Sequence, residues 1–148
     1  MKAMSEPVNI PYYETSNFCF SNFSAHTVTY KGVTYPTAEH AFHGQKFADE
    51  KLCEQIKQCG SPLEAWELAK ELKPQRRTDW NDVKVEILTE IIREKVNQHK
   101  EVKSALLATD DREIIEINEN DDFWGSGSDG KGQNHTGKIL MKIRSELQ

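Results

Sequence analysis

A carboxylate, an aromatic ring, an imidazole and an amine recur at helical spacing near residue 40. They belong to Glu39, Phe42, His43 and Lys46. At about 100° per residue, these side chains share one face of a helix. Such a face can protonate a ligand, stack on its ring and hold its negative charge. The alternative is a half-buried helix on which Glu39 and Lys46 are only solvated, and the helix taken alone favours this alternative.

A second group combines positive charge with an indole. Arg76 and Arg77 directly precede a predicted helix that begins near Trp80. Guanidinium groups and helix N-termini both attract phosphate, and an indole at a helix start can stack on a base. A solvated arginine pair, with Trp80 acting as a hydrophobic staple, fits the same residues equally well. Both interpretations stay open.

The third group is a loop rich in Gly, Asp and Asn that also contains Trp124. Five glycines fall within the thirteen residues from Gly125 to Gly137, and glycine lets backbone amides approach a ligand closely. A plain surface loop rarely includes a tryptophan, so this loop is the strongest local indication of a site. Residues 132–138 also fit the phosphate-loop pattern GxxxxGK, but Ile139 replaces the required Ser or Thr and no apolar strand precedes it. We therefore reject an NTPase.

Cysteine and histidine spacing predicts neither a metal site nor a cofactor. Cys19, Cys53 and Cys59 lack CxxC or Cys/His ligand spacing, so we expect reduced thiols. His40 and His43 are not part of an HExxH motif. The net charge of −5 argues against broad binding to a nucleic-acid backbone, but it allows a pocket for one nucleotide.

No segment approaches the roughly 20 consecutive apolar residues of a membrane span. The N-terminus lacks the apolar region of a secretory signal. We therefore expect a cytoplasmic protein without membrane contact, and the sequence leaves its oligomeric state open.

The elements that must position these residues are mostly helices. Apolar and polar residues alternate on both sides of Lys31-Gly32, which predicts a hairpin with a two-residue turn, and residues 114–117 predict a further strand. Caps and apolar spacing predict helices over residues 37–47, 49–59, 61–73, 101–108 and 139–147. They also predict a longest helix that Asp79 caps and that carries an apolar stripe of Val83, Ile87, Leu88, Ile91 and Ile92. The predicted fold class is mainly α (α+β), with an extended lead-in over residues 1–15 and one compact domain over residues 16–148.

Taken in order, these segments resemble the NADAR family, also called YbiA-like. The matching motifs are Phe20-Ser21-Asn22-Phe23, Gly32, Tyr35-Pro36-Thr37-Ala38-Glu39-His40-Ala41-Phe42 with Lys46, Asp79-Trp80, the Asp121 to Asn134 loop, and Gly137-Lys138 with Leu140, Met141 and Arg144. They span roughly residues 16–146. The resemblance implies a mostly helical N-glycosidase without metal or cofactor. Its substrates would be ribosylamino-pyrimidine 5′-phosphates from early riboflavin biosynthesis, or ADP-ribose attached to a base such as guanine.

The resemblance and the residue chemistry together indicate a set of site residues. Glu39 is expected to be the acid/base carboxylate, and Asp129 the second catalytic group. The expected substrate-binding residues are Asn22, Lys46, Arg77, Trp80, Trp124, Gly125, Gly127 and Asn134. Thr136 stands where the family usually has Leu, and this departure puts the identity of the substrate in doubt.

Other functions remain open. A non-catalytic module could bind ADP-ribose or a related nucleotide in the same pocket. A hydrolase could instead remove ADP-ribose from DNA in an antitoxin-like role, since a flipped-out base needs little contact with the duplex. The expected partner is therefore a small nucleotide-like molecule or an ADP-ribosylated base, with modified DNA as the alternative carrier. A structural role is least expected, because it would not use the glycine-rich loop.

Overall fold

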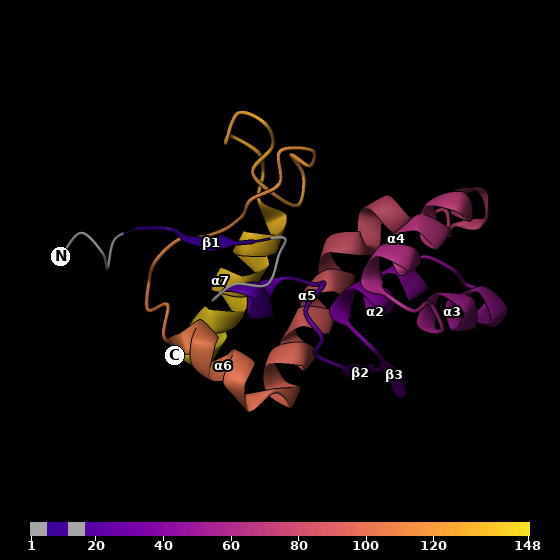
Figure 1. Ribbon diagram of the computed structural model, residues 1–148, viewed down its shortest axis with the longest axis horizontal. Coiled ribbons are helices and arrows are strands. Elements are labelled where there is room, and N and C mark those ends of the chain that lie inside the picture. Colours follow the sequence, from indigo (N-terminus) through magenta and orange to yellow (C-terminus); the bar gives the residue numbers. More distant parts are fainter. Residues whose placement is uncertain (1–5, 12–16) are drawn as a thin grey trace. The chain divides into compact units, whose positions relative to one another are not determined.

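The computed structural model describes residues 6–11 and 17–148, and it divides the chain into two compact units. One unit is Ala25–Gln98, and the other combines Met1–Ser24 with His99–Gln148. The predicted fold class, mainly α with a small β component, is confirmed (Figure 1). The division into a lead-in and one domain stays a prediction, and part of the lead-in, residues 1–5 and 12–15, lies outside the described residues.

The Ala25–Gln98 unit contains a hairpin followed by helices. Its elements are β2 (Val28–Tyr30), β3 (Val33–Tyr35), α2 (Ala38–Gly44), α3 (Glu50–Lys57), α4 (Pro62–Glu71), the short 3₁₀ helix η2 (Lys73–Gln75) and α5 (Trp80–Gln98). The two strands pair antiparallel. Lys31 and Gly32 both have positive φ angles, 51° and 81°, as a two-residue type I′ turn requires. The predicted hairpin is confirmed.

Short polar side chains start the helices of this unit. Thr37 Oγ1 accepts a hydrogen bond from the His40 amide at 3.1 Å, and the Ser61 hydroxyl accepts one from the Glu64 amide at 3.1 Å. The predicted capping box closes one residue earlier than expected, because Glu64 Oε2 accepts from the Gly60 amide at 2.7 Å. Helix α2 ends at Gly44 rather than at Phe47.

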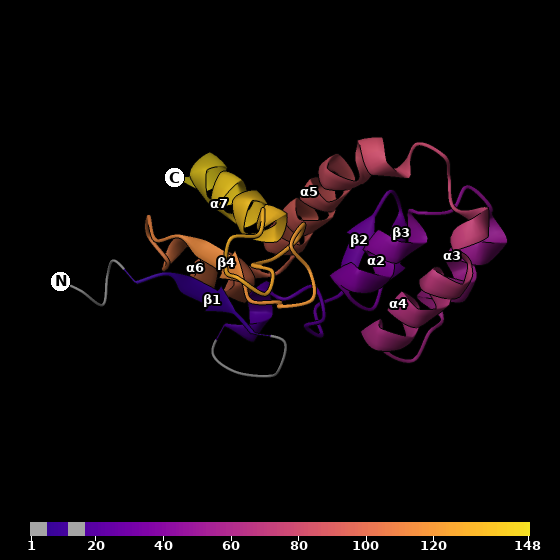
Figure 2. The same cartoon turned by 90° about the horizontal axis from the view of Figure 1, so that it is seen from above.

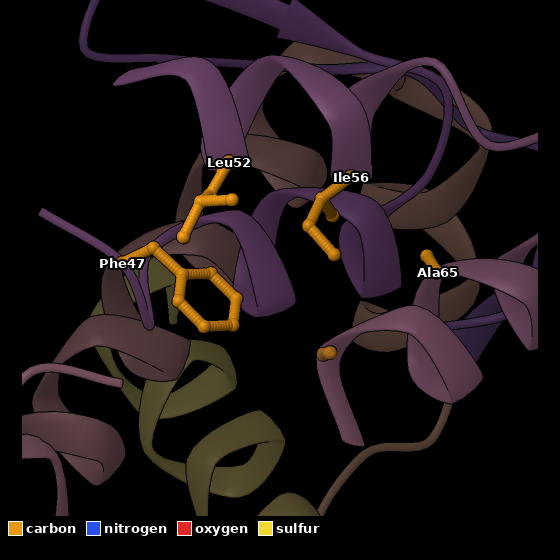
Figure 3. Packing of buried hydrophobic residues seen from close by; sticks show 5 residues of the cluster. Phe47, Leu52, Ile56 and Ala65 are labelled. Atoms are coloured by element: carbon orange, nitrogen blue, oxygen red, sulfur yellow. The ribbon is translucent and has the colours of Figure 1, made fainter. Parts of the chain in front are cut away.

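Helices α2, α3 and α4 pack together and enclose a hydrophobic cluster (Figure 2). Its buried members are Phe47, Leu52, Ile56, Ala65 and Ala69. Leu52 and Ile56 project from α3 toward Phe47 and Ala65 (Figure 3). Burying a side chain of this size contributes roughly 1.5–3 kcal/mol. Every residue of α2 is buried, so the helix that carries Glu39 is a core element.

The longest helix, α5, packs against β2 and α2 through its apolar stripe. Ile87, Leu88, Ile91 and Ile92 are buried, as the spacing predicted, whereas Val83 is half-buried.

The other unit pairs two strands that are far apart in the sequence. Its elements are β1 (Val8–Ile10), η1 (Phe18–Phe20), α6 (Lys100–Leu107), β4 (Ile114–Glu116) and α7 (His135–Leu147). β1 and β4 pair in parallel, with Val8 opposite Ile114. Helix α7 packs on β4 at Gly137, where an added Cβ would overlap the Ile114 carbonyl oxygen. Among the described residues, no helix is long and apolar enough to cross a membrane.

Candidate active site

A buried carboxylate and imidazole form the centre of the candidate site. Glu39 is 8% exposed and His43 is 3% exposed, although both are polar. They lie one turn apart on α2, and His43 Nε2 is 2.7 Å from Glu39 Oε2. The other ring nitrogen, His43 Nδ1, is buried and has no hydrogen-bond partner within the described residues. The pair fixes the orientation of the Glu39 carboxylate, because the imidazole holds one of its two oxygens.

Lys46 places an amine beside this pair. Its Nζ lies 5.7 Å from the centroid of the Phe42 ring and 5.8 Å from that of the Trp80 ring. Burial, helped by the charges of Arg76, Lys84 and Lys73, lowers the pKa of Lys46 to about 8, and the Glu39 carboxylate opposes this shift. The amine therefore changes its charge near neutral pH, so it can hold an anion or exchange a proton.

Trp80 packs inside the unit. It is 3% exposed, and its ring centroid lies 5.0 Å from that of Phe42, with the planes tilted by 55°. This arrangement favours the packing role that the sequence left open beside base stacking. The role of Trp80 in substrate binding stays a prediction.

Arg77 is engaged by a neighbouring carboxylate. Its Nε donates to Asp79 Oδ1 at 2.6 Å and a terminal nitrogen donates to Asp79 Oδ2 at 2.9 Å, which is a bidentate pair. The hydrogen bond from Arg77 holds the pKa of the Asp79 carboxyl below its usual range. A phosphate would have to compete with Asp79 for this guanidinium, and the predicted phosphate role of Arg77 stays a prediction. Its backbone amide donates to the Lys46 carbonyl at 2.8 Å, which ties the segment before α5 to the end of α2.

In the other unit, the glycine-rich loop is fastened by its own backbone. The Ser126 amide donates to the Glu116 carbonyl at 2.9 Å, the Gly127 amide to Asn118 at 3.0 Å, and the Gly132 amide to Ser126 at 2.7 Å. A Cβ at Gly125 would lie 2.8 Å from the Glu116 carbonyl oxygen, and Gly127 has a φ of 68°. Packing and backbone conformation thus account for these glycines without a ligand. Substrate contact by Gly125 and Gly127 stays a prediction.

Asn134 joins the end of this loop to β4. Its Oδ1 accepts from the Glu116 amide at 2.9 Å, and its Nδ2 donates to the Ile114 carbonyl at 2.8 Å. The residue adopts the left-handed conformation, with φ 54° and ψ 45°, which Asn tolerates better than most residues. Its side chain therefore has a clear structural task, and its expected place in the pocket stays a prediction.

Trp124 belongs to an aromatic group at the start of α7. The Phe123 and Trp124 ring centroids lie 4.8 Å apart, and the His135 ring is 4.4 Å from Phe123 and 6.3 Å from Trp124. The His135 and Thr136 amides donate to the carbonyls of Phe123 and Trp124 at 3.1 and 3.0 Å. Loop carbonyls therefore satisfy these N-terminal amides of α7, which are not directed at an external anion.

The two remaining predicted residues differ in exposure. Asp129 is exposed, and its Oδ1 accepts from the Lys131 amide at 2.9 Å. Asn22 is half-buried, and its Oδ1 is buried without a hydrogen-bond partner in the described part of the chain. A ligand donor would satisfy that oxygen. The roles of both residues stay predictions.

The structure brings the predicted residues together in two groups, one in each unit. Glu39, Lys46 and Trp80 cluster in Ala25–Gln98, with Arg77 attached through its backbone. The glycine-rich loop with Trp124, Gly125, Gly127, Asp129 and Asn134 belongs to the other unit, as does Asn22.

Sequence reasoning missed several side chains of the first group. His43 was placed on the correct helix face but given no role, although its spacing of four residues from Glu39 permits the contact. Trp66, Lys70 and Lys73 were also missed, although they recur at helical spacing and line a pocket with Lys46. No group of three or more His, Cys, Asp or Glu side chains in residues 6–11 and 17–148 is arranged for a metal ion. Metal independence stays a prediction.

Comparisons with known proteins agree over nearly the whole chain. The model of the NADAR domain matches residues 6–148. N-glycosidase YbiA of Escherichia coli is 40% identical over 140 residues, which cover 93% of this chain and 88% of that protein. Riboflavin biosynthesis protein VVA0006 of Vibrio vulnificus is 37% identical over 98% of this chain and 40% of its own length. The NMR structure of E. coli YbiA matches with a TM-score of 0.85 and 38% identity, covering 96% of this chain and 86% of that one.

Proposed function

Because the chain belongs to the NADAR family, we propose that it is an N-glycosidase that hydrolyses the bond between a ribose and a nitrogen of a base-like group. The names of its relatives support this reaction class. The observation that carries the proposal to particular residues is the buried Glu39–His43 pair, 2.7 Å apart, with Lys46 beside it.

The reaction needs proton transfer at two places. When the bond from ribose C1′ to nitrogen breaks, the electron pair stays on nitrogen, which takes up a proton, and C1′ resembles an oxocarbenium ion. Water then adds to C1′ and loses a proton. The Glu39 carboxyl group can protonate the departing nitrogen, accept the proton from water, or do both in turn. Positioned acid–base help of this kind is typically worth about 10²–10⁴-fold in rate.

His43 and Lys46 prepare the carboxyl group for this work. The His43 imidazole holds Glu39 Oε2, so Oε1 would be the oxygen that exchanges a proton with the substrate. Lys46 provides positive charge next to the carboxylate while it is protonated, and a proton acceptor above its pKa of about 8.

Two substrate classes fit this proposal. One is a ribosylamino-pyrimidine 5′-phosphate, which the riboflavin-related name of the Vibrio relative favours. The other is ADP-ribose attached to guanine, either as a small molecule or within modified DNA. Asp129 would hold a ribose hydroxyl or stabilise the charge at C1′. The activity would be cytoplasmic and would need neither metal nor cofactor.

The experiment that tests this function offers both substrates to the same protein. Purified protein treated with EDTA is incubated with a ribosylamino-pyrimidine 5′-phosphate and, separately, with a short oligonucleotide carrying ADP-ribosylated guanine. Mass spectrometry follows release of the sugar. We expect cleavage of at least one, and which one is cut decides the substrate class. Binding of either substrate without cleavage would indicate a binding module and contradict the enzymatic function. Activity that returns only with added metal would contradict the metal-free mechanism.

A further inference from the structure

A pocket of about 180 Å³ opens in the Ala25–Gln98 unit, and it shares Lys46 with the Glu39 group, which is the cluster of Glu39, His43, Lys46 and Trp80. It is lined by Lys46, Trp66, Ala69, Lys70, Lys73 and Arg76. Four of these side chains carry positive charge and none carries a carboxylate. This concentration is unexpected in a chain whose net charge is −5.

The pocket is built from three segments that local structure holds in place. Trp66 and Lys70 lie one turn apart on α4, and Lys73 follows at the start of η2. Arg76 comes directly after η2, and the neighbouring Arg77 amide is bonded to the Lys46 carbonyl. This bond brings the arginine segment next to Lys46, which lies in the turn just after α2.

Apart from the Glu39 carboxylate, which acts on Lys46 without forming an ion pair, the pocket offers these positive charges no counter-charge. Within the described residues, none of the four cationic groups forms an ion pair with a carboxylate. Lys46 is half-buried, so its charge is not fully compensated by solvent. A bound anion would relieve the repulsion among the four groups.

Trp66 adds a ring-binding surface to the same pocket. It is 43% exposed, an unusual position for the largest apolar side chain. The Lys70 Nζ lies 5.2 Å from the centroid of the Trp66 ring. This cation–π contact keeps the indole beside the positive charges of the pocket. An exposed indole beside clustered cations is suited to a ligand that joins a phosphate to a flat ring.

We infer that this pocket binds the phosphate end of the substrate, with Lys46, Lys70, Lys73 and Arg76 around the phosphate and, for a substrate such as ADP-ribose, Trp66 against the ring beyond it. This inference rests on the proposed function, because Lys46 belongs both to this pocket and to the Glu39 group. A phosphate monoester carries about −1.5 to −2 charges at pH 7. The four cations match such a group, whereas an unphosphorylated riboside gains nothing from them.

The test measures binding of a product fragment, so it does not depend on turnover. Calorimetry at pH 7 compares ribose 5-phosphate with ribose on the full chain, for the wild type and for Lys70→Ala, Lys73→Ala and the double variant. Both lysines are exposed, so their removal should leave folding intact. Lys51→Ala, an exposed lysine on α3 outside the pocket, is the matched control.

We expect ribose 5-phosphate to bind and ribose not to bind. Each pocket variant should weaken binding of the phosphate roughly tenfold, and Lys51→Ala should leave it unchanged. Trp66→Ala should weaken ADP-ribose more than ribose 5-phosphate, because only the former brings a second ring. Equal binding by the double variant and the wild type would overturn the inference, as would equal affinity for ribose and its phosphate.

The two proposals fail in different ways. If ribose 5-phosphate binding depends on Lys70 and Lys73 but no candidate substrate is cleaved, the phosphate-binding pocket is supported and the N-glycosidase function is contradicted. If a substrate is cleaved with the same KM in the wild type and the double variant, the N-glycosidase function is supported and the phosphate-binding pocket is contradicted.

Discussion

At the scale of single residues, the contact between His43 and Glu39 is the feature most directly tied to chemistry. Both side chains are buried, and a 2.7 Å hydrogen bond joins them. A buried polar group normally requires such a partner. The contact therefore serves the fold and the orientation of the carboxyl group together, and substitutions can separate these tasks.

We predict that His43→Leu lowers kcat on the order of 10²-fold, because the Glu39 carboxyl group loses its fixed orientation. His43→Gln can still donate to Glu39 Oε2 and should restore part of the rate. Steady-state kinetics should show the loss mainly in kcat, with KM little changed. Thermal unfolding of each variant separates this effect from loss of structure, and an unchanged kcat in folded His43→Leu would refute the positioning role.

Lys46 gives a pH-dependent prediction. Its pKa is lowered from 10.5 to about 8 in the folded protein, so between these values the unfolded chain binds more protons and stability rises with pH. Below about pH 8 the amine is charged in both states, and the charge lowers the free energy of unfolding by at most about 3 kcal/mol. Lys46→Met should therefore stabilise the protein at pH 7.

This gain should fade as the pH rises from about 8 toward 10.5, because above that range the amine is neutral in both states. Urea unfolding of the wild type and Lys46→Met at pH 7 and pH 10 measures it. A stabilisation that is equal at both pH values would mean that packing, not charge, produces the difference.

At the scale of elements, helix α2 determines where Glu39 lies. The Thr37 hydroxyl accepts from the His40 amide and also lies 2.8 Å from His40 Nδ1, while His40 Nε2 reaches the Cys59 carbonyl at 3.0 Å. The start of α2 is thus connected to the segment just after α3 through one imidazole. A change at this cap should therefore alter the position of the helix that carries Glu39, and it should also lower the stability of the unit.

We predict that Thr37→Ala lowers the free energy of unfolding by about 1–2 kcal/mol, because the cap and the contact to His40 are lost together. Thr37→Ser keeps the hydroxyl and should lose much less. Urea denaturation compares the two variants with the wild type. Equal losses for Ala and Ser would assign the effect to the methyl group instead of the cap.

The contact between α7 and β4 gives a second prediction at this scale. A Cβ at Gly137 would overlap the Ile114 carbonyl oxygen and also crowd the Asn134 amide group. Gly137→Ala should therefore destabilise the protein by about 2–4 kcal/mol, although alanine favours helices. Ser145→Ala, at an exposed position of the same helix, is the control and should change stability little. A neutral Gly137→Ala would show that the helix can shift away from the strand.

At the scale of the whole molecule, sequence reasoning succeeded where a structure depends on neighbours in the chain. The Lys31-Gly32 hairpin and the helix starts after Thr37 and Ser61 follow from turn and cap chemistry alone. The parallel pairing of β1 with β4 joins residues about a hundred positions apart, and no local pattern encodes it.

The site was predictable only in part, for the same reason. Helical spacing placed Glu39 and His43 on one face, but their burial depends on α3, α4 and α5 packing around α2. The loop glycines were attributed to ligand approach, because a sequence does not show that the Glu116 carbonyl lies opposite Gly125. The sequence likewise does not show that Arg77 pairs with Asp79 or that Arg76 lines the pocket.

In the proposed function, Glu39 performs proton transfer in hydrolysis of an N-glycosidic bond. The most direct test is the rate of sugar release by Glu39→Gln, measured by mass spectrometry on whichever candidate substrate the wild type cleaves. Glu50→Gln, an exposed glutamate on α3, is the matched control. We predict that Glu39→Gln binds substrate but turns it over about 10²–10⁴-fold more slowly, while Glu50→Gln is fully active. Wild-type turnover by Glu39→Gln would show that Glu39 does not transfer the proton.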